Sequence, residues 1–181
     1  MAETSDEDMS SDEMTSSSDD MTEGSDDYTI TVLKSDIPSP RKEMKGEIGG
    51  AMITVNYGSP SVKGRTLWGG LVPYDQVWRA GANEATTIEV SKDIMIGDKT
   101  LAAGKYGFFL LPKEGAAWEV IFNEVSEQWG AYDYDQAKDV IRVMAEPMMV
   151  DESHETMDYM IDGDNLVLYW GKLKLPIAIS A

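Results

Sequence analysis

The residues best suited to chemistry gather in one stretch, 57–86, which reads YGSPSVKGRTLWGGLVPYDQVWRAGANEAT. Cations, an amide and a carboxylate lie there beside three aromatic side chains. Arginine presents a planar fork of donors that matches a carboxylate or phosphate, and tryptophan and tyrosine faces suit sugar rings. The polar members are Lys63, Arg65, Arg79, Asn83 and Glu84, and the aromatic members are Trp68, Tyr74 and Trp78.

We interpret this stretch as the wall of a pocket for a small polar or sugar-like ligand. Arg65 and Arg79 would hold an anionic or hydroxyl group, Asn83 would hydrogen-bond to it, and Trp68 or Trp78 would stack on it. Lys63 belongs to the same predicted ligand-binding set. A structural alternative stays open, in which the aromatic side chains are core and Arg79 forms an ion pair with Glu84.

A second interpretation is a hydrolase of the glycoside type with Glu84 as the catalytic acid/base. Such enzymes need two carboxyl groups facing each other across a cleft. The partner of Glu84 stays open between Glu124, Asp133 and Asp135. A third interpretation is a structural or envelope-interaction module that binds no ligand.

Nucleophilic and metal chemistry is poorly supported. The sequence has no cysteine and a single histidine, His154, so a zinc site and a cysteine nucleophile are not expected. A serine nucleophile such as Ser59 or Ser61 would depend on His154, which we expect in an exposed loop. Carboxylates at 132–135, 151–155 and 162–165 do not have EF-hand spacing, and no glycine-rich phosphate loop is present. We therefore predict no metal and no cofactor.

Period-two alternation dominates the elements that must position these residues. We expect about ten short strands, at 44–48, 51–57, 85–90, 93–96, 105–111, 118–123, 140–145, 157–161, 166–170 and 173–179. Frequent turns, such as Gly49-Gly50, separate the strands. The sequence therefore predicts an all-β fold, an antiparallel β-sandwich or barrel of jelly-roll type, with little helix.

The chain divides into three parts by composition. Residues 1–27 hold eleven acidic residues and no Lys or Arg, which predicts a disordered tail rich in Ser, Asp and Met. Residues 28–40 are expected to form a linker or a short leading strand, which ends at Pro38 and Pro40. A single β domain is expected at 41–181.

Charge and hydropathy limit the partners. The net charge is −18, from 33 acidic and 15 basic residues. Nucleic acid and anionic membrane surfaces are poor partners, because both require clustered Lys and Arg. No apolar run approaches the roughly 18 residues that a transmembrane helix needs, so we expect no membrane insertion of the domain. The oligomeric state is left open.

Several blocks of the chain resemble a bacterial family known as domain of unknown function 2911. The similarity runs over about residues 38–180, and its most specific block is 78–86. The family pattern would place a basic residue near Ser59 and an acidic one near Gly171, where this chain differs. The matching blocks are 57, 60–65, 71–74, 77–86, 101–106, 118–123, 129–132 and 166–170.

The resemblance implies a β-rich domain on proteins exported through a cell envelope and often lipid-anchored, with no established activity. We therefore expect a periplasmic, outer-membrane-anchored or secreted protein. The acidic Ser/Asp segment would then serve as a spacer behind a lipid anchor that lies outside this chain. Mass spectrometry of the native N-terminus tests this, and an unmodified start at Met1 would contradict it.

Overall fold

A computed structural model describes residues 28–128 and 134–181. The predicted disordered tail at 1–27, the 129–132 block and Asp133 therefore lie outside the described residues. The larger of the two sheets has seven antiparallel strands in the order β1-β2-β3-β4-β7-β8-β9. Their bounds are β1 (Tyr28–Lys34), β2 (Arg41–Ile48), β3 (Ala51–Gly58), β4 (Thr87–Val90), β7 (Gly104–Leu111), β8 (Trp118–Asn123) and β9 (Asp139–Ala145).

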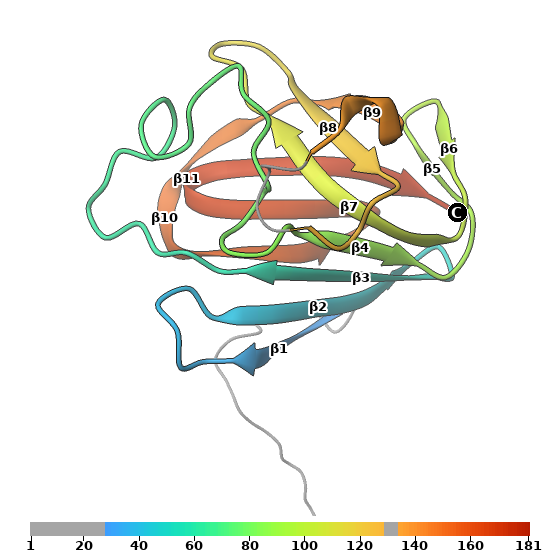
Figure 1. Ribbon diagram of the computed structural model, residues 1–181, viewed down its shortest axis with the longest axis horizontal. Coiled ribbons are helices and arrows are strands. Elements are labelled where there is room, and N and C mark those ends of the chain that lie inside the picture. Colours follow the sequence, from blue (N-terminus) through green and yellow to red (C-terminus); the bar gives the residue numbers. More distant parts are fainter. Residues whose placement is uncertain (1–27, 129–133) are drawn as a thin grey trace, which may run out of the picture.

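The smaller sheet has four strands in the order β10-β11-β5-β6 and lies across the first (Figure 1). Its strands are β10 (Met148–Asp162), β11 (Asn165–Ser180), β5 (Ile94–Ile96) and β6 (Lys99–Leu101). In the described residues the only helical element is a short 3₁₀ turn, η2 (Gln136–Lys138). The prediction of an all-β antiparallel sandwich is confirmed.

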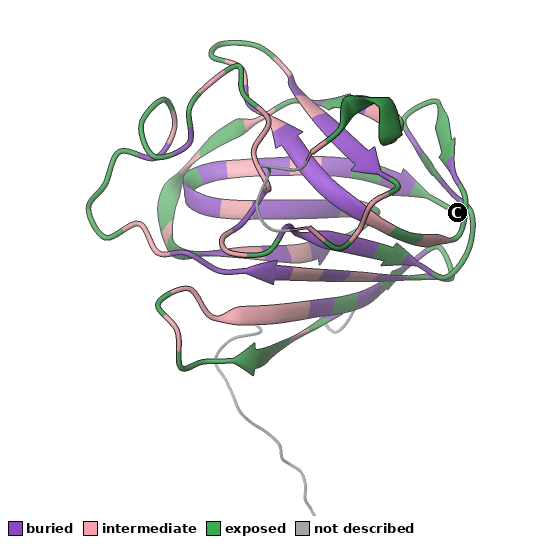
Figure 2. Ribbon diagram, viewed as in Figure 1, coloured by how far each residue is buried: buried purple, intermediate pink, exposed green. Residues whose placement is uncertain are grey.

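Alternation along the strands places the core between the sheets. In β3 the side chains of Ile53, Val55 and Tyr57 are fully buried, and the residues between them are more exposed. These side chains join Phe108 from β7 and Leu168 from β11 in one cluster. Figure 2 shows the buried residues concentrated on the central strands of both sheets, and the exposed ones on β1, on part of β10 and on many connections.

Two strands of the smaller sheet are longer than the sequence indicates. Residues 151–155, expected as a loop, lie within β10, and β11 runs without interruption through Gly171. The polar run is compatible with a strand because β10 is an edge strand whose residues 151–155 are mostly exposed, and its register shifts before and after His154. Segment 60–62 pairs with the outer side of β10 at Glu155 and Met157. Gly171 lies opposite His154 and takes φ +60°, which accommodates the irregularity.

A second, smaller core lies on the outer face of the seven-stranded sheet. It consists of Ala85, Phe109 and Ile121, and Tyr134 packs against it. The segment after β8 crosses this face directly over Gly107, where an added Cβ would lie 2.4 Å from the Val125 carbonyl oxygen. Segments far apart in the chain therefore meet outside the sandwich as well as inside it.

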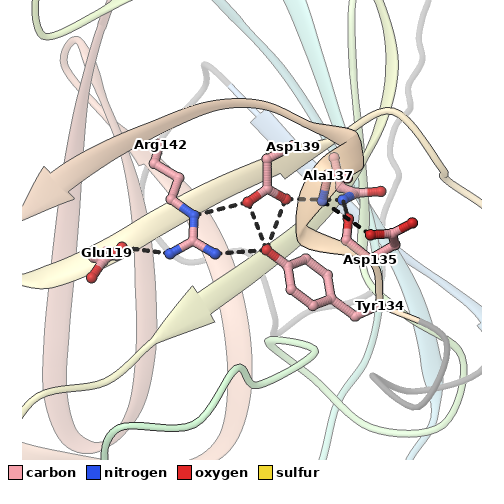
Figure 3. A network of polar contacts seen from close by, with 7 residues as sticks. Glu119, Tyr134, Asp135, Ala137, Asp139 and Arg142 are labelled. Atoms are coloured by element: carbon pink, nitrogen blue, oxygen red, sulfur yellow. Dashed lines mark hydrogen bonds and ion pairs between the residues drawn. The ribbon is translucent and has the colours of Figure 1, made fainter.

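A polar network fixes the segment that covers this outer core (Figure 3). Arg142 donates to Asp139 (2.8 Å), to Glu119 (2.7 Å) and to the Tyr134 hydroxyl (2.7 Å). The Tyr134 hydroxyl donates in turn to the Asp139 carboxylate at 2.6 Å. Burial lowers the pKa of Arg142, but these hydrogen bonds outweigh burial and raise the pKa above its ordinary value. The network thus joins β8, β9 and the segment before η2.

Alkaline pH should weaken this network. Burial and then the hydrogen bond to Asp139 raise the pKa of Tyr134 to about 12, from an ordinary value of 10. The stabilisation is therefore complete below pH 10 and is lost as the pH rises through about 12. We expect the melting temperature of Tyr134→Phe to fall less steeply than wild type over this interval. A Tyr74→Phe control should follow wild type. If the melting temperature falls equally steeply with pH in all three proteins, the loss of stability does not come from Tyr134.

Candidate functional site

The 59–86 segment lies at one end of the sandwich and is fixed there by backbone hydrogen bonds. Trp78 exchanges two of them with Leu110 at the end of β7, at 2.8 and 3.0 Å. Asp75 donates its N–H to the Pro112 carbonyl oxygen at 2.8 Å. Further along, the Ala82 N–H donates to Gly58 at the end of β3. The long loop predicted from the sequence is thus a rigid part of the domain.

Four of the five tryptophans meet beside this segment. The Trp68 ring contacts Trp78, Trp118 and Trp170 at centroid distances of 5.7, 5.2 and 5.7 Å. Trp78 stacks on Trp170 at 6.1 Å with 16° between the planes. Such contacts stabilise beyond simple area burial and hold each ring in place. The predicted stacking residues Trp68 and Trp78 therefore belong partly to the core.

The backbone around Arg79 and Asn83 is strained. Among the described residues, the four non-glycine residues with positive φ all lie in this segment: Lys63, Asp75, Ala80 and Asn83. The Ala80 carbonyl oxygen accepts from the Tyr159 hydroxyl at 2.7 Å and from the Thr86 hydroxyl at 3.0 Å. Burial raises the pKa of Tyr159 well above its usual value, so this hydroxyl remains a donor. Strain of this kind often accompanies functional sites.

Four of the six predicted ligand-binding residues line one cavity of about 310 Å³, which we name the arginine hollow. These four are Arg65, Trp78, Arg79 and Asn83. The volume falls at the lower end of small-molecule sites, which span roughly 300–1,000 Å³. The remaining lining residues are Ser39, Pro60, Leu71, Val72, Gly81, Ala82 and Trp170.

Two buried donors at this hollow have no acceptor among the described residues. Arg79 Nε and Trp170 Nε1 are both inaccessible to solvent and make no hydrogen bond. A buried N–H without a partner costs roughly 1–3 kcal/mol, so native proteins seldom retain one without a reason. Because neither atom is accessible, a ligand in the hollow could accept from them only if the side chains moved.

Arg65 is positioned differently from Arg79. Its Nε donates to the Val62 carbonyl oxygen at 3.0 Å, and its Nη2 donates to the Ser61 carbonyl oxygen at 2.5 Å. These bonds orient the guanidinium and leave Nη1 available. The ion pairs found in the described residues include neither Arg65 nor Arg79. Two cations without a carboxylate partner thus face one hollow of a strongly acidic protein.

Glu84 lies outside the arginine hollow. Its carboxylate is 3.8 Å from Arg41, so the cation beside Glu84 comes from β2 rather than from the expected partner Arg79. Burial lowers the pKa of Arg41, and the charge of Glu84 opposes this shift. Both residues line a larger cavity of about 830 Å³, which we name the sheet-face hollow. Ser39 and Asn83 line both hollows, and Asn83 Nδ2 donates to the Ser39 carbonyl oxygen at 3.3 Å.

The other candidates are placed apart from the arginine hollow. Lys63 is exposed and does not line it, and Trp68 lines a third cavity of about 410 Å³ together with Tyr74 and Trp118. His154 lies in β10 with its ring 4.5 Å from Tyr169, a correction to the exposed loop expected from the sequence. Ser59 is buried, and its hydroxyl donates to the Met157 carbonyl oxygen at 2.6 Å.

Neither a metal site nor a membrane span is found in the described residues. In the described residues, no group of three or more His, Asp or Glu side chains is arranged to hold a metal ion. Over the same residues, no helix is long and apolar enough to cross a membrane.

Sequence reasoning missed three important residues: Trp170, Arg41 and Ser39. Trp170 lines the arginine hollow, and its place in a predicted strand suggested only a core role. Arg41 stood at the predicted domain boundary, where nothing linked it to Glu84. Ser39 lies between two prolines, which indicated only a break in the chain.

A family model matches nearly the whole of the β domain. Residues 39–179 match the model of a family described as "Protein of unknown function (DUF2911)". The chain belongs to this family. No curated protein and no solved structure matches the chain. The DUF2911 region begins at Ser39, so it includes every residue that lines the arginine hollow.

Proposed function

We propose that this DUF2911 domain binds a small polar ligand with an acidic group in the arginine hollow. The observation that carries the proposal is that Arg65 and Arg79 line one cavity and neither forms an ion pair among the described residues. Carboxylates and phosphates offer several acceptor oxygens and no obligatory donor, so they match these two groups. Trp78 and the buried indole of Trp170 would form the wall beside it.

The charges of the hollow support an acid over a neutral ligand. Among the described residues, its ionisable lining residues are Arg65 and Arg79, and none of the lining residues is acidic. A neutral sugar would fill some of these positions with hydroxyl oxygens, but it would leave the two cations without a counter-charge.

Binding is favoured over hydrolysis by the position of Glu84. Its carboxylate lies 3.8 Å from Arg41 and not among the cations of the arginine hollow. Glu84 is also largely exposed and lines the sheet-face hollow rather than the arginine hollow. We further propose, on the family resemblance alone, that the domain works in the cell envelope.

The test is calorimetric titration of glucuronate, citrate and phosphate into wild type and two charge-matched variants. Arg79→Met should weaken binding of the acid that binds wild type at least tenfold, or about 1.4 kcal/mol, because the buried fork is lost. Lys63→Met removes the same charge from an exposed side chain of the same segment and should change the affinity less than about twofold.

Two results would contradict the proposal. Equal losses in the two variants would mean that net charge, and not the hollow, attracts the acid. If none of the three acids binds at low ionic strength, where electrostatic attraction is strongest, the arginine hollow is not an acid-binding site.

A further inference from the structure

The third cavity, of about 410 Å³, has walls of a different chemistry from the other two. We name it the aromatic hollow, because Trp68, Tyr74 and Trp118 line it. Trp68 and Tyr74 are half-buried, so both keep exposed surface, whereas Trp118 is buried. The aromatic hollow shares no lining residue with the arginine hollow or the sheet-face hollow. Its volume is sufficient for a small ligand of its own.

Separate contacts hold the three rings of the aromatic hollow in place. Trp68 is held by its contacts with the other three tryptophans of the cluster. Trp118 Nε1 donates to the Lys113 carbonyl oxygen at 3.0 Å. The Tyr74 ring lies against Gly69, where an added Cβ would come within 2.9 Å of Tyr74 Cε2. Because the rings are already ordered, a ligand that contacts them loses little affinity to side-chain ordering.

The charges at the aromatic hollow favour a cation. Glu146 lines the cavity, is exposed, and forms no ion pair among the described residues. Lys113 also lines it, but its Nζ lies 3.3 Å from the Asp75 carboxylate. The three groups together carry one positive and two negative charges, and the net charge of −18 acts in the same direction.

A quaternary ammonium group matches these walls better than a primary one. The faces of tryptophan and tyrosine attract a cation, and Glu146 supplies the counter-charge. A quaternary nitrogen has no N–H, so it leaves no donor unsatisfied when apolar walls displace its water. The Lys113 carbonyl oxygen already accepts from Trp118, which leaves it less available to an ammonium N–H. Met149 is 68% exposed and adds polarizable apolar surface to the cavity.

We propose that the aromatic hollow binds a trimethylammonium group of the choline type. The methyl groups lie against Trp68 and Tyr74, and Glu146 balances the charge. This inference does not rest on the proposed function, because the two hollows have no lining residue in common.

The test compares choline with 3,3-dimethylbutanol, which has the same shape and no charge, by calorimetric titration at constant ionic strength. Choline should bind about fivefold more tightly, because only the cation is attracted by the ring faces and by Glu146. Methyl glucoside, a neutral sugar, should bind more weakly than choline. Co-sedimentation with phosphatidylcholine vesicles distinguishes the sources of the group: binding to choline alone indicates a free solute, and binding to both indicates a lipid headgroup.

Four variants test the assigned roles. Glu146→Gln should weaken choline binding about threefold, and Lys113→Met should strengthen it about threefold, because an attractive and a repulsive charge are removed. Tyr74→Leu should weaken binding about fivefold, whereas Tyr74→Phe keeps the ring face and should stay within about twofold of wild type. Glu114→Gln is the matched control: it is exposed, lies outside the cavity lining and should change the affinity less than about 1.5-fold.

Three results would overturn the proposal. If choline does not bind, or binds no more tightly than 3,3-dimethylbutanol, the aromatic hollow is not a cation site. If Glu146→Gln and Glu114→Gln cause equal losses, choline is attracted by the net charge alone. If methyl glucoside binds more tightly than choline, the rings stack on sugars instead. None of these results bears on glucuronate, citrate or phosphate binding in the arginine hollow, which stands or fails by its own titration.

Discussion

Gly58→Ala is expected to lower the free energy of unfolding by roughly 3–4 kcal/mol, at the upper end of overpacking costs. A Cβ added at Gly58 would lie 2.2 Å from the Ala82 carbonyl oxygen and 2.9 Å from the Ala82 carbonyl carbon. Both atoms are backbone, so they cannot move aside as a flexible side chain would. The hydrogen bond from the Ala82 N–H to the Gly58 carbonyl oxygen draws the same two segments together.

The consequence of Gly58→Ala reaches the arginine hollow, because Ala82 and Asn83 line it. We therefore expect weaker acid binding together with the loss of stability. Urea unfolding measures the stability, and Met52→Ala on the same strand is the control, since Met52 is 40% exposed. A loss for Gly58→Ala below about 1 kcal/mol would show that this close approach is not essential.

Replacement of Arg41 by methionine is expected to cost about 3 kcal/mol, because buried acceptors lose their donor. The guanidinium side chain is only 15% exposed and holds Asn56, Glu84 and Ala85 together. Methionine keeps much of the apolar stem but satisfies none of these oxygens. Lys45→Met, an exposed change on the same strand, should cost less than about 0.5 kcal/mol.

Differential scanning calorimetry of the Arg41 and Lys45 variants measures this difference. Similar melting temperatures for the two variants would show that Arg41 is not structural. We expect Arg41→Met to lower the melting temperature and to leave the glucuronate affinity unchanged, because Arg41 does not line the arginine hollow.

The strands were predictable from sequence because alternation is a local signal. β3 and β8 appear almost at their expected bounds, and their buried positions follow from the apolar residues at every second place. β10 was not fully predictable, since its polar run at 151–155 carries no alternation. The run is extended because it lies on the edge strand of the smaller sheet, between β11 and the pairing with segment 60–62 at its end.

The site was predictable only in part, for a related reason. Arg65, Trp78, Arg79 and Asn83 lie within one segment, so sequence proximity indicated that they would meet. The contribution of Trp170 comes from the far end of the chain, and the pairing of Glu84 with Arg41 spans 43 positions. Contacts of this range depend on the order of strands in the sheets, which no local pattern contains.

The tryptophan cluster has a consequence for how this protein responds to light. Indole rings stacked as closely as Trp78 and Trp170 share their excited states, so their circular dichroism and emission belong to the pair rather than to either ring. Trp118 and Trp68 belong to the same group of coupled rings, because the Trp68 ring lies 5.2 Å from Trp118 and 5.7 Å from Trp170. Any molecule that settles against Trp78 thereby changes a collective optical signal, and the domain contains its own unlabelled reporter.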